Sequence, residues 1–315
     1  RVAGIDEMYR LSDGSMIESH ALVSQSKYSE SSPHKLGYAF GLSYWKMTRD
    51  LDYGITLKDL SEDFSAEIGY VSRTGIFGVT GIARPKFYPR SGFISRIDAE
   101  AFTGWTLDKM SELWETFNHL SIQSYIFGSL TIKVKYSYST EVFSGEKFET
   151  GGFHILAGGQ FHKDLYASVL YRRVKSIYYS QDPYQGKGNK IQSLVRYQPT
   201  DKLSSELSFV YTDFYRMSDG AEVFSYPIFR EKLTYQINKY LFLRGIAEYN
   251  NYRKSLLTDA LVSFTYIPGT VIHLGYGSLF EKISWDEFTE NYEPSTRFLE
   301  SKRGIFIKMS YLWRM

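Results

Sequence analysis

The chain has 315 residues, with 37 Lys and Arg against 35 Asp and Glu, and this balance excludes the strong basic excess typical of a nucleic-acid binder. It contains no cysteine, which excludes disulfides, thiolate metal sites and cysteine nucleophiles. No apolar run approaches the roughly 18 residues of a membrane-spanning helix, and the mean hydropathy is −0.31, so a helical membrane protein is excluded as well.

An alternation of apolar and polar residues with a period of two runs through the chain and predicts β-strands. In one example, Leu130, Ile132 and Val134 share one face, while Thr131 and Lys133 share the other. These stretches come close to the ~9–11 residues with which a tilted strand crosses a bilayer, and they exceed the ~5–6 of typical soluble strands. In chain order, the clearest stretches are residues 51–58, 130–138, 206–212, 241–250, 259–266 and 305–313.

Aromatic residues form 17% of the chain, with 27 Tyr and 22 Phe, which is more than a core alone requires. Several lie at the ends of apolar rows, where a barrel carries its interfacial girdles of aromatic side chains. These are Tyr138, Tyr197, Tyr211, Tyr249, Tyr266, Tyr311 and Trp313.

The connections between predicted strands alternate in length, as in outer-membrane barrels with short turns on one side and long loops on the other. Short turns are expected at residues 12–15, 48–49, 89–92, 128–129, 163–164, 200–201, 238–239 and 268–269. Longer polar stretches are expected at residues 27–34, 59–73, 144–151, 177–188, 218–223 and 282–301.

The predicted fold class is therefore all-β: a transmembrane antiparallel up-and-down β-barrel of about 16–18 strands, forming one domain over residues 1–315. Our count of about 17 strands is odd, whereas bacterial barrels normally have an even number. We expect either that Arg1 lies inside a larger barrel whose N-terminal portion is lacking, or that one strand near residues 69–88 is miscounted.

Charged residues on the polar faces of the predicted strands are candidates for the lining of the lumen. Two interpretations stay open: a lumen that selects solutes or holds a plug, and mutually paired charges that fill a wet interior. The candidates are Arg96, Asp98, Glu100, Lys133, Lys135, Arg196, Glu206, Arg244, Glu248 and Lys308.

The stretch 282–301 is rich in acids and aromatics, and its binding candidates are Trp285, Asp286, Glu287 and Tyr292. Aromatic faces with carboxylates suit a carbohydrate ligand or a calcium ion, while the alternative is an ordered loop packed over the barrel mouth. No segment matches a dedicated calcium loop, and the sequence predicts no cofactor and no metal site.

Enzymatic motifs are absent: none of the six His forms a HExxH pair, and no GxSxG occurs. His273 and His119 are the histidines that a membrane-embedded hydrolase would use, but the sequence assigns no catalytic residue.

Several short segments resemble one bacterial family. They are Asp63-Phe64 followed by residues 69–74 (GYVSRT), residues 266–270 (YIPGT), the closing residues 307–314 (IKMSYLWR), and the opening residues 2–6 and 9–11. The family is a domain of unknown function that forms the C-terminal part of outer-membrane proteins whose N-terminal domain resembles family 9 carbohydrate-binding modules. The resemblance covers most of the chain and implies a β-barrel with a role in glycan binding or uptake, without catalytic residues.

Three functions follow as hypotheses, each with bacterial outer-membrane lipid as a partner and with an unknown oligomeric state. The first is a barrel for binding or uptake of glycans or small solutes across the outer membrane. The second is a barrel that anchors a carbohydrate-binding domain and transports nothing. The third is a membrane-embedded hydrolase. A soluble β-sheet protein is the general alternative, but it would have to cover the apolar faces with a second sheet.

Overall fold

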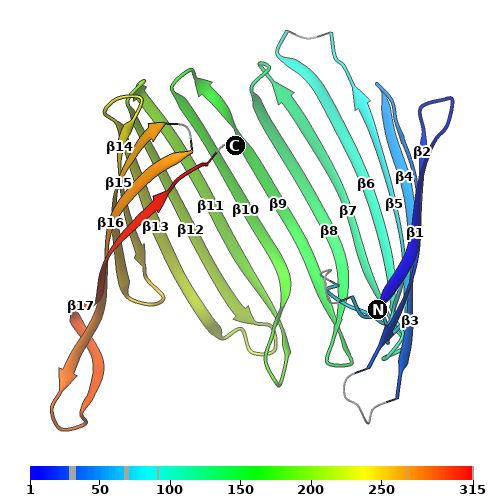
Figure 1. The fold of residues 1–315 in the computed structure, drawn as a ribbon. Coiled ribbons are helices and arrows are strands. Elements are labelled where there is room, and N and C mark those ends of the chain that lie inside the picture. Colours follow the sequence, from blue (N-terminus) through cyan, green and yellow to red (C-terminus); the bar gives the residue numbers. More distant parts are fainter. Residues whose placement is uncertain (28–32, 67–70, 91, 268, 314–315) are drawn as a thin grey trace. The chain divides into compact units, whose positions relative to one another are not determined.

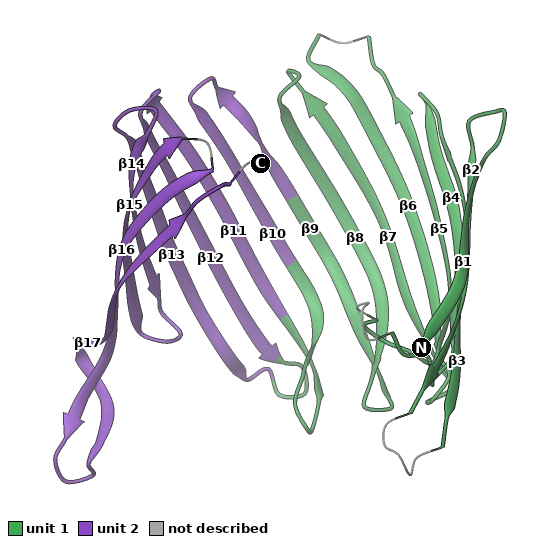
Figure 2. Cartoon of the chain, in the orientation of Figure 1, with its two compact units in different colours: residues 1–155, 173–187, 216–219 green, residues 156–172, 188–215, 220–315 purple. Residues whose placement is uncertain are grey.

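The computed structural model describes residues 1–27, 33–66, 71–90, 92–267 and 269–313. Across these residues it contains seventeen β-strands and no helix. No helix that is long and apolar enough to cross a membrane is therefore found in this part of the chain. Two compact units are coloured in Figure 2: unit 1 is residues 1–155, 173–187 and 216–219, and unit 2 is residues 156–172, 188–215 and 220–315.

Unit 1 is an antiparallel meander in which each of the first eight strands pairs with the next one in the chain (Figure 1). The strands are β1 (Val2–Arg10), β2 (Met16–Ser26), β3 (Lys35–Met47), β4 (Leu51–Leu60), β5 (Ile76–Phe87), β6 (Ile94–Asp108), β7 (Leu113–Ile126), β8 (Leu130–Phe143) and the first part of β9 (Glu146–His162).

Unit 2 continues the same pattern, and β12 to β17 again pair antiparallel in chain order. Its strands are β13 (Glu222–Gln236), β14 (Leu241–Asn250), β15 (Ser255–Ile267), β16 (Thr270–Asp286), β17 (Asn291–Ser310) and the larger parts of β10 (Leu165–Tyr178), β11 (Tyr184–Thr200) and β12 (Leu203–Arg216). The prediction of an all-β, antiparallel, up-and-down fold is confirmed, and the described strands agree in number with the predicted range.

The two faces of unit 1 differ because side chains alternate along each strand and the register carries the alternation across the ladder. One row across β3 to β6 is apolar, and the row beside it, across β3 to β8, is mostly polar or small. We call these the apolar face and the polar face. The first row is Leu42, Leu57, Val79 and Trp105, and the second is Ser43, Thr56, Thr80, Gly104, Phe117 and Ser139.

Burial in unit 1 is the reverse of that in a water-soluble protein. Leu42 and Trp105 on the apolar face are exposed, whereas Ser43 and Ser139 on the polar face are buried. Among the described residues of the whole chain, eight hydrophobic residues are buried against twelve polar or charged ones. The buried layer is therefore not an ordinary apolar core.

Unit 2 repeats this reversal. A row of apolar residues crosses β13 to β17 by direct register partners, and every member is exposed. The row is Tyr235, Leu243, Val262, Leu274 and Ile307. The buried residues of the neighbouring face include Ser255, Leu261 and Ser263 of β15.

Two of the predicted long loops are wrong. Residues 144–151 are not a loop, because β8 and β9 are joined by a two-residue turn at Ser144 and Gly145, both with positive φ, which is the backbone geometry of a tight hairpin. Residues 282–301 are mostly strand, because β16 and β17 extend to a turn of residues 287–290. Polar composition alone does not distinguish a loop from two strands that lead into a tight turn.

The segments of the family resemblance are only partly described. Residues 69–70, Pro268 and Arg314 lie outside the described residues. Between residues 69 and 88, where we suspected a miscounted strand, the described residues form the single strand β5.

Candidate functional site

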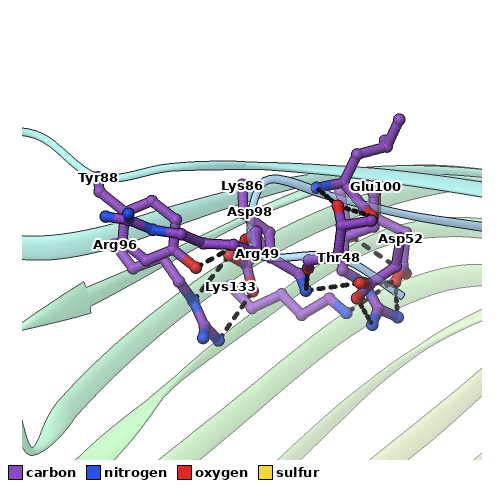
Figure 3. Close-up of polar contacts among 12 residues, drawn as sticks. Thr48, Arg49, Asp52, Lys86, Tyr88, Arg96, Asp98, Glu100 and Lys133 are labelled. Atoms are coloured by element: carbon purple, nitrogen blue, oxygen red, sulfur yellow. Dashed lines mark hydrogen bonds and ion pairs between the residues drawn. The ribbon is translucent and has the colours of Figure 1, made fainter. Parts of the chain in front are cut away.

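Charged side chains gather on the polar face of unit 1 around a cavity of about 270 Å³ (Figure 3). The cavity contains four of the predicted lumen candidates, Arg96, Asp98, Glu100 and Lys133. We call the charged residues of this cavity the charge cluster: Asp52, Arg84, Lys86, Arg96, Asp98, Glu100 and Lys133. Ser121, Gln123 and Tyr125 complete the lining.

Alternation and register together bring the charge cluster into one place. Arg96, Asp98 and Glu100 are spaced two apart on β6 and so point to the same side. Their neighbours in the ladder are equally polar: Asp98 lies between Lys86 of β5 and Gln123 of β7. The cluster lies near the strand ends that short turns join, because β4 and β8 begin close to it, at Leu51 and Leu130.

Glu100 is the most heavily contacted carboxylate in the charge cluster, and its residue is only 9% exposed. Arg84 donates from Nε at 2.7 Å and makes a second, shorter contact from Nη2. Lys133 Nζ lies 3.6 Å from Oε1, which also contacts His119 Nε2 at 2.8 Å. A buried carboxylate with this many donors orders the side chains around it.

The other two carboxylates of the cluster are paired as well. Asp52 accepts from Lys86 Nζ at 2.6 Å and lies 3.8 Å from Arg84. Asp98, which is 7% exposed, lies 2.9 Å from Arg96 Nε, although that contact lacks hydrogen-bond alignment. The Arg96 guanidinium also lies over the Tyr125 ring, 4.1 Å from its centroid, a favourable cation–π arrangement.

The charge cluster is close to self-neutral, with four cations and three carboxylates, and each carboxylate contacts at least one of the cations. This is the arrangement of mutually paired charges, one of the two interpretations of the lumen candidates. Chemically, it offers fixed donors and acceptors to a small polar solute, and Gln123 supplies an uncharged amide beside them.

Three members of the cluster were missed in the sequence: Asp52, Arg84 and Lys86. The alternation of residues 51–58 does place Asp52 on the polar face, but β5 carries no clean alternation around Pro85. Proline lacks an N–H, and the β5–β6 ladder has no register partner at Arg84 and Pro85.

Lys135 lies near the cluster, opposite Ser121. Four of the five candidates in unit 2, Arg196, Glu206, Arg244 and Glu248, form separate ion pairs on its polar face. Glu206 accepts from Arg196 at 2.7 Å and from Lys232 at 2.9 Å. Glu248 pairs with Arg230 at 2.9 Å, Arg244 lies 3.5 Å from Asp259, and Lys308 faces His273 across the ladder.

The predicted loop candidates lie mainly in strands rather than in a loop. Trp285 of β16 faces Tyr292 of β17, with ring centroids 5.1 Å apart and both side chains half exposed. Asp286 accepts from Phe288 N at 2.8 Å, so this carboxylate stabilises the turn. Only Glu287 lies in the turn itself.

The two candidate histidines of a hydrolase lie in different units. His119 contacts Glu100 and stacks on Phe102 at 5.2 Å. The hydroxyl directly opposite it in the ladder, Ser137, bonds Gly152 and contacts His154 instead. His273 has a buried Nδ1 with no hydrogen-bond partner in the described residues. Neither histidine is aligned with a hydroxyl that it could deprotonate.

The described residues of the connection from β4 to β5, 61–66 and 71–75, lie against the polar face of unit 1. Phe64 is 5% exposed, and its backbone lies above Gly37, where an added Cβ would come within 2.3 Å of Phe64 N and Cα. Ser65 N donates to Ser24 Oγ at 3.1 Å, and Ser24 is the register partner of Gly37. Because glycine has no side chain, position 37 leaves room for this connection to pack against the sheet.

The far end of the same connection is held by Arg73, on the polar side of β6 and β7. Its guanidinium donates to both oxygens of Glu115 at 2.8 Å and to Asp108. Burial opposes the charge, but the hydrogen bonds to Glu115 and Asp108 outweigh it and raise the pKa of Arg73. The described parts of the connection thus reach from β2 and β3 to β6 and β7, and they narrow the space over the polar face.

Replacing Gly37 with leucine is expected to displace this connection, because the new Cβ has no room beside Phe64. Trypsin cleaves after arginine, so the rate of cleavage after Arg73 should be low in the wild type and high in Gly37→Leu, where the connection no longer packs on the sheet. Gly245→Leu is the matched control, since an added Cβ there meets nothing within 4 Å. Equal resistance in Gly37→Leu and in the wild type would contradict the contact.

Among the described residues, no group of three or more His, Asp or Glu is arranged to hold a metal ion. The charge cluster mixes its carboxylates with four cations, which oppose a bound cation.

The fold and the site together define a class: an all-β, up-and-down antiparallel protein with an exposed apolar face and a charged polar face. No family model and no curated protein matches the chain. In vitro folded OmpT, an outer membrane protein of Vibrio cholerae, is similar at 11% identity and a TM-score of 0.34, covering 98% of this chain and 100% of that one. OmpF of Salmonella typhi in complex with daunomycin is similar at 12% identity and a TM-score of 0.35, covering 78% of this chain and 92% of that one. OmpT of Vibrio cholerae expressed in the outer membrane is similar at 10% identity and a TM-score of 0.31, covering 98% of this chain and 100% of that one.

Proposed function

We propose that this chain is a transmembrane β-barrel of a bacterial outer membrane whose polar face lines a path for small polar solutes. The observation that supports it is the reversal of burial in both units: rows of exposed apolar side chains beside buried serines and paired charges. A lipid-facing strand surface needs this pattern, because the bilayer solvates apolar side chains and the lumen solvates polar ones.

Strand length supports the same conclusion. Most strands of both units have 10 to 17 residues, enough for the ~9–11 residues with which a tilted strand crosses the hydrocarbon layer. In water, rows such as Leu42, Leu57 and Val79 would form an apolar patch of the kind that soluble monomers rarely expose.

For the solute, we propose a small polar molecule that the charge cluster orients as it passes. Arg84, Arg96 and Lys133 supply donors, and Asp52, Asp98 and Glu100 supply acceptors. A glycan fits such a lining, and it is the ligand that the family resemblance suggests. In the competing hypothesis, the barrel anchors a carbohydrate-binding domain and conducts nothing.

Conductance and heat modifiability test the proposal. The protein is expected to fractionate with the outer membrane, to shift mobility on a gel when boiled, and to give stepwise ion currents when inserted into planar bilayers. Protein that stays soluble without detergent would overturn the membrane assignment. A folded, membrane-inserted protein without current would overturn transport and leave the anchor.

Gln123→Trp provides a sharper test of the path. Gln123 lines the cavity of the charge cluster and lies between Asp98 and Lys133 in the ladder. An indole there would fill part of the about 270 Å³ of free space, so we expect single-channel conductance to fall by roughly half or more. Ile122→Trp, one residue away on the apolar face, is the control and should leave conductance unchanged.

A further inference from the structure

The polar face of unit 2 carries an excess of cations. From β10 to β15 it carries six cations and three carboxylates among the described residues. The cations are Arg172, Lys190, Arg196, Arg230, Lys232 and Arg244, and the carboxylates are Glu206, Glu248 and Asp259. The four cations from Arg196 onward all contact one of these carboxylates.

The remaining two cations, Arg172 and Lys190, have no carboxylate. No hydrogen bond or ion pair joins either side chain to any described residue. They lie on neighbouring strands and share a face: Tyr171 OH bonds Asn189 Oδ1 at 2.9 Å on the opposite face, and the next residue of each strand points the other way. Like charges on neighbouring strands of one face repel each other.

Arg172 has a hydrogen-bond donor that no described residue satisfies. Its Nε is buried and has no partner in the described residues, while Arg172 and Lys190 as whole residues are partly exposed. Nε and the adjacent Nη form the edge of guanidinium that binds the two oxygens of a carboxylate or phosphate. A buried donor without an acceptor destabilises the fold, and two neighbouring cations add repulsion. An oxyanion bound between Arg172 and Lys190 relieves both.

We propose that Arg172 and Lys190 form a binding site for a compact oxyanion, a phosphate or carboxylate group of a soluble ligand, on the polar face of unit 2. The site deepens the proposed function, on which it rests, because it makes anionic solutes the preferred class. The excess of cations on this face attracts anions over several ångströms, and the Arg172 edge fixes their orientation.

Binding of inorganic phosphate to the detergent-folded protein, followed by broadening of the phosphorus NMR signal, tests the site without requiring an open pore. We expect saturable binding to the wild type and binding weaker by on the order of tenfold or more in Arg172→Gln/Lys190→Gln, since a charged hydrogen bond is worth ~1.5–3 kcal/mol. Arg172→Lys keeps the charge but loses the bidentate edge, so it should bind with intermediate affinity. Lys187→Gln removes one cation from the other face of β11 and should bind as the wild type does.

Each outcome bears on the proposal. Wild-type protein without saturable binding, a double variant that binds as tightly as the wild type, or an equal loss in Lys187→Gln would each overturn it. All variants must first show the heat-modifiable mobility of folded protein. Phosphate binding without bilayer current would contradict the transport function but support the site. Current without phosphate binding would contradict the site alone.

Discussion

Replacing Ile55 with lysine is expected to lower the free energy of unfolding by about 2–4 kcal/mol when the protein is folded into lipid vesicles. Ile55 lies in the middle of β4 on the apolar face, with Tyr44 and Gly81 as its register partners. It is 54% exposed, so a lysine there meets whatever surrounds this face. In hydrocarbon the charge has no solvation, and the folded state loses stability.

The matched control is Thr56→Lys, one residue along the same strand and on the polar face. On this face the lysine reaches water. It also lies two strands from Glu18, whose carboxylate is 3.5 Å from Ser43, the register partner of Thr56. We expect a change of within about 0.5 kcal/mol, as for ordinary surface substitutions. Urea unfolding in vesicles measures both variants, and an Ile55→Lys as stable as Thr56→Lys would show that the apolar face meets water.

Glu100→Gln is expected to destabilise the protein by roughly 2–3 kcal/mol, because it leaves Arg84 and Lys133 facing each other without their shared carboxylate. Breaking a fully buried ion pair costs ~3–5 kcal/mol. The Arg84 side chain is 37% exposed, so water screens part of its charge and the expected loss is smaller.

The control for this variant is Glu146→Gln, which removes the same charge from an exposed position at the start of β9. It should change stability by no more than about 0.5 kcal/mol. A second variant, Glu100→Gln with Lys133→Gln, should recover part of the loss because one unpaired cation is gone. Urea unfolding measures the stability of all these variants. If Glu100→Gln alone is as stable as Glu146→Gln, the charge cluster does not stabilise the fold.

The all-β class and the division of each strand into an apolar and a polar face could be predicted from the sequence, because both follow from backbone geometry. Alternation at residues 130–138 predicts β8, and the structure exposes Ile132 and Val134 while burying Ser137 and Ser139. The same logic placed Glu100 and Lys133 on the polar face, where both line the cavity.

Loop length was harder to predict. The stretches 144–151 and 282–301 look like loops because they are polar, yet most of their residues belong to β9, β16 and β17. Near the β16–β17 turn, almost all residues from Asn291 to Leu299 are exposed, so the apolar half of the alternation disappears there. The turn at Ser144 and Gly145 is set by two positive φ angles, which the polar composition around it does not reveal.

By itself, the sequence determined the all-β class, the approximate strands and the face on which each charge lies, since side-chain direction depends only on position along a strand. Only the tertiary structure decided which charges meet. Asp52, Arg84 and Glu100 are far apart in the chain, and register brings them around one cavity. Register likewise gave Glu206 two cations and left Arg172 and Lys190 with no carboxylate, because partners are set by hydrogen bonds between strands and not by residues within one strand.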